Sequence, residues 1–406
     1  MVRLSSQSRP RAADHPVGLT AVNRRIRVAM VVRLFHPWVG GTERQALTLA
    51  KSMQAAGVDV TVLTGRWFRG TRRREEVEGV PVIRHQTLWE FFGIRGLRKF
   101  GGYLYIVTLA AHILRHRRQY DVLHVHGLNY HTYATVKAAK LAHRPVLVKV
   151  ANSGPASDVL KMKQGEQLAL ARYMLPTALA ADRFVALNPT IVDELTAAGV
   201  PRSSIVHIPN GIDLTSTATM EQTSSTGSSR ILFVGRLHPQ KNLQTLIQAV
   251  AKIHAERPGE LSVSLIGEGP ARPDLEDLIR GLGLHDVVDM PGEANNVSPH
   301  LLHADIFVLP SHAEGMSNAL LEAMAHQLPV VVSDIPGNRD VVTDGVDGLT
   351  FDPQSADDLA SKLLTLVTDP ELRQRLGCAA RQVVMSTYDL EIVRDRYIEI
   401  YDALTT

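Results

Sequence analysis

The chain has 406 residues, 45% hydrophobic and 21% charged, which is the composition of a globular protein with room for two cores of roughly 180–200 residues each. One cysteine, Cys378, excludes an internal disulfide and a cysteine metal cluster, and no run reaches the ~18 apolar residues of a membrane span. The net charge of +3 is divided unevenly, because residues 1–205 carry 30 Lys and Arg against 13 Asp and Glu, whereas residues 206–406 carry 14 against 28. The two halves are therefore expected either to meet different partners or to pack against each other.

Residues 1–24 are expected to form a loose basic arm, because the first 27 residues carry six arginines and lack the apolar core of a signal peptide. From residue 25 to residue 213, short β-branched runs alternate with longer helical patterns, which predicts a first domain of parallel α/β units. The expected strands are Ile26–Val32, Val58–Thr64, Pro81–Arg84, Val122–His126, Pro145–Val150, Arg183–Ala186 and Ile205–Ile208, and helical patterns lie at Glu43–Ala56, Gly93–Arg117 and Ile191–Ala198.

A Ser/Thr-rich stretch with almost no apolar residue follows, so residues 214–229 are expected to form a flexible linker. The α/β pattern then restarts and predicts a second domain over residues 230–388, followed by an amphipathic helix within residues 389–406. Its expected strands are Ile231–Val234, Ser262–Ile266, Val287–Met290, Asp305–Leu309 and Val330–Ser333, with helical patterns at Leu243–His254, Asp274–Leu282 and Asn318–His326. The fold class is thus α/β, with two Rossmann-like parallel sheets facing across a cleft, where strand carboxyl ends place ligand sites.

The segment from Ser311 to Glu322 follows a predicted strand and enters a helix. Glu314 is expected on the loop, Ser317 or Asn318 can cap the helix, and Glu322 lies about one turn inside it among apolar residues. A carboxylate in such surroundings needs hydrogen-bond donors, and ribose hydroxyls would serve. The amides at the helix start would face a phosphate. The alternative is that both carboxylates are ordinary surface charges.

Two cations follow the strand that ends in Gly235. Arg236 and Lys241 lie five residues apart on the loop that enters the next helix, an arrangement that suits a diphosphate and would stabilise a departing phosphate. The alternative is two solvated surface cations. A further glycine turn, at Gly267, is common in Rossmann-like domains and is weak by itself.

In the first half, Gly40 and Gly41 link a strand to a helix. The G-x-G-x-x-G spacing is absent, so the segment does not predict a dinucleotide site. The two glycines still allow the backbone to approach a ligand closely. A plain flexible turn is the alternative. His124 and His126 point to the same face of one strand, but no third ligand stands nearby, so no metal site is expected. We expect packing for His124 and a substrate contact for His126.

Aromatic and basic residues alternate from Trp89 to Tyr120, including Phe91, Phe92, Phe100, Tyr103 and Tyr105. This composition fits a helix on an anionic membrane surface. A core helix with a solvated basic face is the alternative.

Together these segments resemble the family-4 retaining glycosyltransferases, which have the GT-B fold. The resemblance extends from about Arg27 to Tyr401 and is specific because six signatures occur in order. They are Gly40-Gly41-Thr-Glu, His126-Gly, Pro209-Asn-Gly-Ile-Asp213, Gly235-Arg-Leu-x3-Lys241, Gly267-Glu-Gly-Pro and Glu314-x7-Glu322.

The resemblance implies that Arg236 and Lys241 bind the donor diphosphate, that Glu322 holds the ribose, and that Glu314 and His126 contact the transferred sugar, which makes Arg236, Lys241, Glu314 and His126 the catalytic set. Asn210 would lie at the domain junction. Two departures from the family pattern are Asn242, where many members have glycine, and Asn188, where serine is common. The implied donor-binding residues are Gly40, Gly41, Gly235, Gly267, Gly315, Met316, Ser317, Asn318 and Glu322.

The implied reaction is retaining transfer of a hexose from a UDP- or GDP-linked donor to a glycan or lipid-linked acceptor, without a cofactor or metal, since no Asp-x-Asp segment is present. A cytoplasmic location is expected, at the inner face of the membrane if the basic aromatic stretch binds lipid. Alternatives are a nucleotide-sugar epimerase of similar fold or a non-catalytic nucleotide-sugar-binding protein. No nucleic-acid partner is expected, although the basic first half raises that question.

Overall fold

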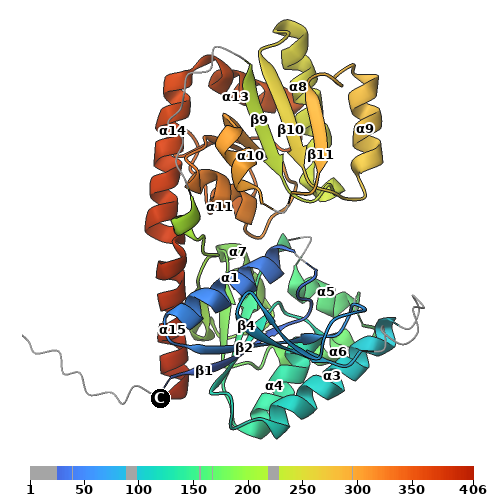
Figure 1. Cartoon of the computed structure of the whole chain (residues 1–406), viewed down its shortest axis with the longest axis vertical. Coiled ribbons are helices and arrows are strands. Elements are labelled where there is room, and N and C mark those ends of the chain that lie inside the picture. Colours follow the sequence, from blue (N-terminus) through green and yellow to red (C-terminus); the bar gives the residue numbers. More distant parts are fainter. Residues whose placement is uncertain are drawn as a thin grey trace, which may run out of the picture.

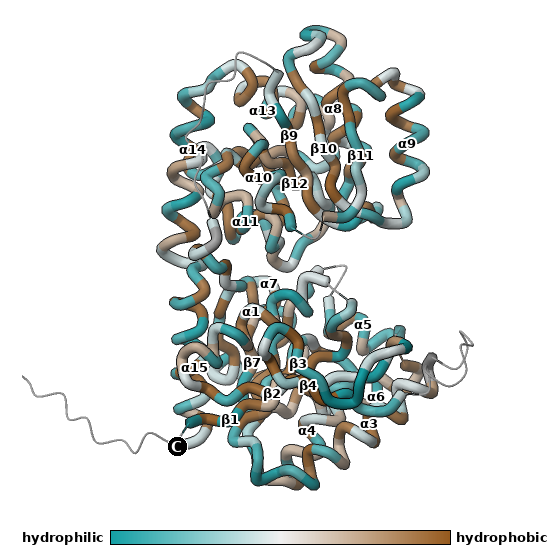
Figure 2. Tube along the Cα trace, viewed as in Figure 1, coloured by the Kyte–Doolittle hydropathy of each residue, from teal (hydrophilic) through white to brown (hydrophobic). Residues whose placement is uncertain are grey.

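The computed structural model describes residues 25–38, 40–87, 98–154, 157–166, 168–217, 228–294 and 296–406. It contains two α/β domains, one above the other in Figure 1, and the last helices of the chain run along both. Apolar residues concentrate on the strands inside each domain (Figure 2). The prediction of two parallel-sheet α/β domains is confirmed.

The first domain is built on an eight-stranded sheet with the order β3-β4-β2-β1-β5-β6-β7-β8. All neighbouring strands are parallel except β3 and β4, which form an antiparallel pair at one edge. The central strands are buried on both faces, as expected for a sheet covered by helices. The strands are β1 (Arg27–Val32), β2 (Asp59–Gly65), β3 (Arg74–Val77), β4 (Val80–His85), β5 (Val122–His126), β6 (Val146–Val150), β7 (Arg183–Ala186) and β8 (Ile205–His207).

Helices cover the two faces of this sheet unequally. One face carries α3 (Arg98–Arg115), α4 (Tyr130–Ala142), α5 (Asp158–Gln164), α6 (Ala171–Ala178) and α7 (Pro189–Ala197), which share one apolar core with it. The opposite face is covered by α1 (Gly41–Ala55) and by the last helix of the chain, α15 (Leu390–Thr405). Two short 3-10 turns, η3 (Arg202–Ser204) and η4 (Leu214–Ser216), flank β8.

The second domain has a six-stranded parallel sheet with the order β11-β10-β9-β12-β13-β14. Its strands are β9 (Ser229–Val234), β10 (Leu261–Ile266), β11 (Val288–Gly292), β12 (Ile306–Leu309), β13 (Val330–Ser333) and β14 (Leu349–Phe351). Its helices are η5 (Pro239–Lys241), α8 (Leu243–Glu256), α9 (Arg272–Gly281), α10 (Ser298–His303), α11 (Asn318–Ala325), α12 (Pro336–Arg339), α13 (Ala356–Thr368), α14 (Pro370–Val383) and η6 (Val384–Tyr388).

The chain passes between the domains twice, and the two passages touch. Ile212 donates its N–H to the Tyr388 carbonyl at 2.8 Å, and Leu390 donates back to the Ile212 carbonyl at 3.0 Å. Gly211 lies so close that a Cβ there would stand 3.0 Å from the Leu390 Cα. After this point α15 returns along the first domain and buries Val393, with Tyr397 and Tyr401, against the sheet.

Two short strands, β3 and β14, are absent from the sequence-based expectations. The four residues of β3 include one hydrophobic residue and three charged ones, so no apolar pattern marks the strand. Its place is fixed by pairing with β4 and by an ion pair between Glu75 and the fully buried Arg84. Within the expected linker the structure describes residues 214–217 and 228–229, and β9 already begins at Ser229.

Candidate active site

Two glycine turns interlock at the carboxyl ends of β9 and β10. Gly235 donates its N–H to the Ile266 carbonyl at 3.0 Å, and Leu237 donates to the Glu268 carbonyl at 2.9 Å. A Cβ on Gly267 would stand 1.9 Å from the Gly235 carbonyl oxygen, and the φ of Gly267 is +143°. Glycine is therefore required at 267 by the contact between the turns as well as by the backbone.

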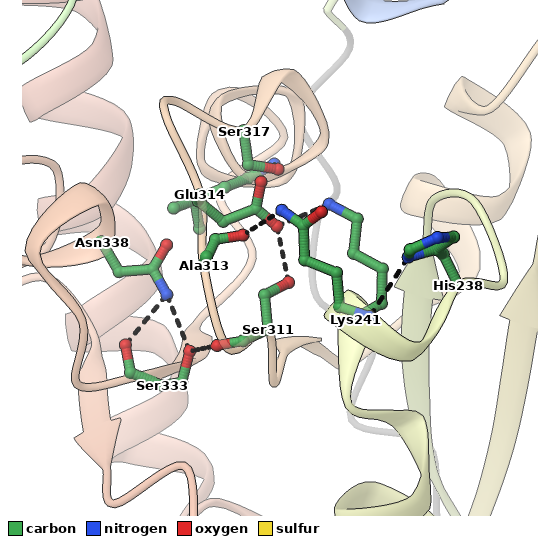
Figure 3. Close-up of polar contacts among 10 residues, drawn as sticks. His238, Lys241, Ser311, Ala313, Glu314, Ser317, Ser333 and Asn338 are labelled. Atoms are coloured by element: carbon green, nitrogen blue, oxygen red, sulfur yellow. Dashed lines mark hydrogen bonds and ion pairs between the residues drawn. The ribbon is translucent and has the colours of Figure 1, made fainter. Parts of the chain in front are cut away.

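The same interlocked loop carries Lys241 to Glu314, which follows the neighbouring strand β12 (Figure 3). The Lys241 ammonium lies 2.5 Å from Glu314 Oε1, and the Ser311 hydroxyl donates to that oxygen at 2.5 Å. Gln240 donates to the Ala313 carbonyl at 2.7 Å and ties the two loops together. Two charged groups that the sequence places 73 residues apart thus form one partly buried pair.

Behind this pair the loop is held by buried polar contacts. The Ser333 hydroxyl donates to the Ser311 carbonyl, and Asn338 donates to the Ser333 carbonyl at 2.9 Å (Figure 3). A Cβ on Gly337 would stand 2.3 Å from the Glu314 carbonyl oxygen. The Glu314 backbone is therefore packed against α12, and the position of its carboxylate is well defined.

Arg236, the other expected phosphate ligand, lies on the same loop as Lys241 but is exposed. No other described residue forms a hydrogen bond or ion pair with its side chain. Its charge is thus available to a ligand at the carboxyl end of β9, where a diphosphate would lie against the two cations of this loop.

Glu322 lies in the second turn of α11 and faces the first domain. Its Oε1 is 3.5 Å from Arg44 Nη1, on α1 of the first domain. Burial raises the pKa of the Glu322 carboxyl, and the nearby Arg44 charge opposes that rise. The sequence predicted a carboxylate in need of donors, and the structure supplies one donor from the opposite domain.

The residues that precede Glu322 contact the first domain through hydrogen bonds and close backbone packing. The Asn188 amide donates to the Gly315 carbonyl at 2.8 Å, and a Cβ on Gly315 would stand 2.0 Å from the Ala151 carbonyl oxygen. The Asn210 N–H points at Met316 Sδ, 3.2 Å away. Asn188, the departure from the serine common in the family, is therefore a donor between the domains.

The cap of α11 is Ser317, whose hydroxyl accepts the Leu320 N–H at 3.4 Å. This frees the Asn318 side chain, which accepts from the Asn210 amide at 2.9 Å and donates to the Gly41 carbonyl at 3.2 Å. Of the two predicted caps, Ser317 is the one observed, and Asn318 links α11 to the first domain.

Gly40 and Gly41 lie at the start of α1, facing α11. A Cβ on Gly40 would stand 2.5 Å from the Glu43 carboxylate, whose pKa is raised by burial. At Gly41 the nearest described atom to a Cβ would be Asn318 Nδ2, at an ordinary 3.5 Å. The close contact at Gly40 is with the far end of the flexible Glu43 side chain, so packing within the described residues requires a glycine at neither position.

His126 ends β5 and is buried together with His124, whose ring centroid lies 4.4 Å away. The His124 ring bonds the Tyr401 hydroxyl at 2.7 Å, which confirms that His124 packs inside the protein. Neither His126 ring nitrogen has a hydrogen-bond partner among the described residues, and burial lowers its pKa well below the usual range. Beside it Lys149 is buried with its ammonium 5.9 Å from the Tyr397 ring centroid.

The second departure from the family pattern also has a local cause. Asn242 follows Lys241 with φ +53° and ψ +36°, a left-handed conformation that favours glycine and tolerates asparagine. Its amide donates to the Pro353 carbonyl at 2.9 Å. Asparagine therefore adopts a backbone conformation here that glycine would also allow.

Sequence reasoning missed Arg44, Ser311 and Lys149. Arg44 lies next to the Gly-Gly-Thr-Glu signature, but only the fold brings it to Glu322, 278 residues away. Lys149 interrupts a strand of four valine and leucine residues, a pattern that does not show which face is buried. Within the described residues, no group of three or more His, Cys, Asp or Glu side chains is arranged to hold a metal ion, and no helix is long and apolar enough to cross a membrane.

Comparison with known families gives two matches that cover most of the chain. Residues 39–216 match the family described as Glycosyltransferase Family 4, and residues 217–383 match the family described as Glycosyl transferases group 1. The boundary between the two matches, at residue 216, lies after β8 and before β9.

Relatives with assigned names include glycogen synthase of Mycobacterium tuberculosis, 28% identical over 402 residues and covering 93% of this chain and 94% of the relative. D-inositol 3-phosphate glycosyltransferase of Kineococcus radiotolerans is 29% identical over 393 residues, covering 84% and 85%. Alpha-D-kanosaminyltransferase of Streptomyces kanamyceticus is 32% identical over 173 residues, which span 42% of this chain and 45% of that relative.

Solved structures of similar fold include sucrose-phosphate synthase from Thermosynechococcus elongatus, with a TM-score of 0.77, 20% identity and coverage of 94% of this chain and 99% of that one. The Anabaena protein HepE in complex with UDP and glucose has a TM-score of 0.74 at 18% identity, covering 93% and 100%. These likenesses extend over both domains.

Proposed function

Because the chain belongs to the family-4 glycosyltransferases and has the GT-B fold, we propose that it transfers a hexose from a nucleotide diphosphate sugar to a glycan or lipid-linked acceptor, with retention of the anomeric configuration. The donor is linked to UDP or GDP. The proposal assigns the donor to the second domain and the acceptor to the first.

One observation supports the proposal: three of the expected donor ligands, Lys241, Glu314 and Glu322, lie on the loops that follow the neighbouring strands β9 and β12 and on the helix α11 that comes next. Lys241 is 2.5 Å from Glu314, and Glu322 faces Arg44 at 3.5 Å. Cations suit the two phosphates, and the carboxylates suit the hydroxyls of ribose and hexose. Gly41 of the first domain lies next to this site, because its carbonyl accepts a hydrogen bond from the Asn318 amide at 3.2 Å.

In the proposed reaction the donor diphosphate lies against Arg236 and Lys241. As the bond between the anomeric carbon and the phosphate oxygen breaks, negative charge grows on that oxygen, and these cations stabilise it without a metal ion. The acceptor hydroxyl attacks from the face that the phosphate leaves, so configuration is retained. Its proton passes to the departing phosphate oxygen, and the products are the glycoside and the nucleoside diphosphate.

The assignment of His126 follows the same geometry. Its unpartnered ring nitrogens, at the carboxyl end of β5, have unused hydrogen-bonding capacity that a sugar hydroxyl would fill. Burial keeps the ring neutral, because its pKa is well below the usual range. A neutral ring both donates and accepts, which suits a hydroxyl better than an anion.

We further propose that the enzyme acts in the biosynthesis of a polysaccharide or glycolipid, in the cytoplasm at the inner face of the membrane. The support is chemical: the basic first domain is the acceptor side, and lipid-linked acceptors present phosphate or sugar at a charged surface. A soluble glycan acceptor is the competing assignment.

A thermal-shift screen of the full chain against nucleoside diphosphates and nucleotide sugars tests the donor. Stabilisation by UDP or GDP and by one of its sugars is expected. NMR of the product then gives the anomeric configuration, and an inverted product would overturn the proposal.

The two alternatives have distinct outcomes in the same assays. Conversion of the donor alone to an epimer would support an epimerase. Tight donor binding with neither hydrolysis nor transfer to an acceptor extract would support a non-catalytic binding protein. A covalent sugar trapped on an Asp or Glu would exclude the front-face mechanism but leave the transferase assignment standing.

A further inference from the structure

The helices on one face of the first domain expose an unusual number of large apolar side chains. Among the described residues, eleven large hydrophobic side chains are exposed, and six lie between residues 98 and 179. They belong to α3–α6 and their connections, and include the largest exposed fractions among the large hydrophobic residues that the structure describes. They are Phe100 (59%), Val107 (62%), Leu141 (67%), Leu160, Leu170 and Tyr173 (66%).

These helices form one layer. α3 packs on α4, α4 on α6, and α5 on α6, and a Cβ on Gly102 of α3 would touch the Leu168 side chain beside α6. Their inner sides share one core with the sheet. Their outer sides therefore point away from the same face of the sheet, opposite to the face that α1 and α15 cover.

On α3 the outward stripe is itself apolar. Phe100, Val107 and Ala111 are exposed at helical spacing, while Tyr105 and Leu109 are buried on the other side. The helix is apolar over most of its length (Figure 2), although an ordinary surface helix has a polar outer side. The aromatic residues Trp89, Phe91 and Phe92, which precede α3, lie outside the described residues.

The exposed charges on the helices of this layer are positive. Across α3–α6, all within the described part of the chain, the one acidic residue is Asp158, and it is buried. Exposed cations are present on α4, α5 and α6, at Lys137, Lys140, Lys163 and Arg172. The connection from α5 to α6 carries one exposed acidic residue, Glu166. The described part of the connection from α4 to α5 carries none.

Two of these cations lie over tyrosine rings. Lys137 Nζ is 5.5 Å from the Tyr133 centroid, and the Arg172 guanidinium carbon is 4.7 Å from the Tyr173 centroid. Tyrosine, lysine and arginine side chains each have an apolar body and a polar tip, and such side chains suit the boundary between lipid and water.

We propose that the outer face of α3–α6 is a docking surface for an anionic lipid bilayer, on which Phe100, Val107 and Tyr173 enter the headgroup region and the cations contact lipid phosphates. Apolar side chains on helices whose exposed charges are positive suit this surface. The acidic second domain, with 14 Lys and Arg against 28 Asp and Glu over residues 206–406, is repelled by the same bilayer and faces the cytoplasm. The role of this surface rests on the proposed function, because docking would bring the first domain to a lipid-linked acceptor.

Co-sedimentation of the full chain with vesicles tests the surface. We expect binding to phosphatidylcholine vesicles that contain phosphatidylglycerol, and much weaker binding to phosphatidylcholine alone. Lys137→Glu with Lys140→Glu should lower the partition coefficient on the mixed vesicles by about tenfold or more. Phe100→Ser with Val107→Ser, which leaves net charge unchanged, should also lower it, because the apolar contact is lost.

A matched control changes charge elsewhere on the same domain. Lys51 on α1 and Arg183 on β7 are exposed and lie outside this layer, so Lys51→Glu with Arg183→Glu should change binding by less than about twofold. Absence of wild-type binding, an equal loss in the control pair, or unchanged binding of the serine pair would each overturn the proposal. The last result would mean attraction to any polyanion.

The same variants separate this inference from the proposed function. Thermal shifts with nucleoside diphosphates should be unchanged in all of them, because no substituted residue lies near Lys241, Glu314 or Glu322. If vesicle binding behaves as expected while no nucleotide stabilises any protein, the donor assignment fails and the docking surface stands. The opposite pattern would remove the docking surface alone.

Discussion

The Arg44 guanidinium of the first domain lies 3.5 Å from the Glu322 carboxylate of the second. Without donor, the group proposed to hold the ribose is thus occupied by a cation of the opposite domain. A ribose that reaches Glu322 must displace Arg44 or share the carboxylate with it. A donor held by Glu322 would therefore be coupled to the contact between the domains through one side chain.

Replacing Arg44 with methionine should loosen this closed arrangement. Arg44→Met keeps much of the side-chain length and removes the charge, so the donor-free protein should show a larger radius of gyration by small-angle X-ray scattering. Lys51→Met on the same helix is the control, because Lys51 pairs with Glu78 inside its own domain. An unchanged radius in Arg44→Met would mean that Asn188 and Asn318 hold the domains without it.

The Glu322 carboxyl should give donor affinity a pH dependence. Its pKa is raised by burial, and ribose hydroxyls donate to the ionised form, so donor affinity should fall as the pH drops through this raised pKa. Arg44 favours the ionised form, and in Arg44→Met the fall should move to higher pH. Isothermal titration calorimetry across acidic pH measures both curves, and Glu322→Gln should bind donor weakly at every pH. A curve identical in Arg44→Met would contradict the assignment.

Loss of either loop cation should reduce turnover far more than stability. Lys241→Ala or Arg236→Ala is expected to lower kcat by about 10²–10³-fold, because charge on the leaving phosphate is no longer balanced. Lys252→Ala, at an exposed pair with Asp357, controls for the loss of a surface lysine. Release of nucleoside diphosphate measures turnover, and circular dichroism checks the fold. Normal turnover in Lys241→Ala would remove the diphosphate assignment.

The sequence predicted those features of the site whose residues are close together along the chain, and it did not predict contacts between distant segments. The Ser317 cap and the position of Glu322 inside a helix are local, so residue types and spacing were enough. The Lys241–Glu314 pair joins two adjacent loops, and strand order determines whether such loops meet. The Arg44–Glu322 contact depends on how two domains pack, for which the sequence carries no periodic signal. The polar edge strand β3 was missed for a different reason, since its position is set by β4 and Arg84.

The contact between the two glycine turns should be sensitive to a single methyl group. Gly267→Ala would place a Cβ 1.9 Å from the Gly235 carbonyl oxygen, and we expect a loss of about 2 kcal/mol or more in the free energy of unfolding. Gly281→Ala, at the end of α9 where a Cβ meets no atom within 4 Å, should be neutral or slightly stabilising. Urea denaturation measures both, and equal stabilities would contradict the packing.

Lys149 should make stability depend on pH in an unusual direction. Burial lowers its pKa to about 7 from 10.5, so the unfolded chain binds the proton first as the pH falls. Above 10.5 both states are neutral. As the pH falls from 10.5 to about 7, the free energy of unfolding decreases by about 1.4 kcal/mol per pH unit, because only the unfolded chain binds the proton. Below about 7 both states bind it, and the decrease stops. Lys149→Met removes this slope, and urea midpoints of the two proteins between pH 7 and 9.5 should therefore converge as the pH rises.

The paired passages at Ile212 and Asp389 make the first domain discontinuous in sequence. Its apolar sheet face is completed by Val393, Tyr397 and Tyr401, which the chain supplies only after the whole second domain. A fragment that stopped at residue 213 would leave that face uncovered, while a single cut in the 214–229 segment would leave two pieces still held together by α15. The two domains therefore cannot be exchanged between relatives at one junction, because the last helix must travel with the first domain.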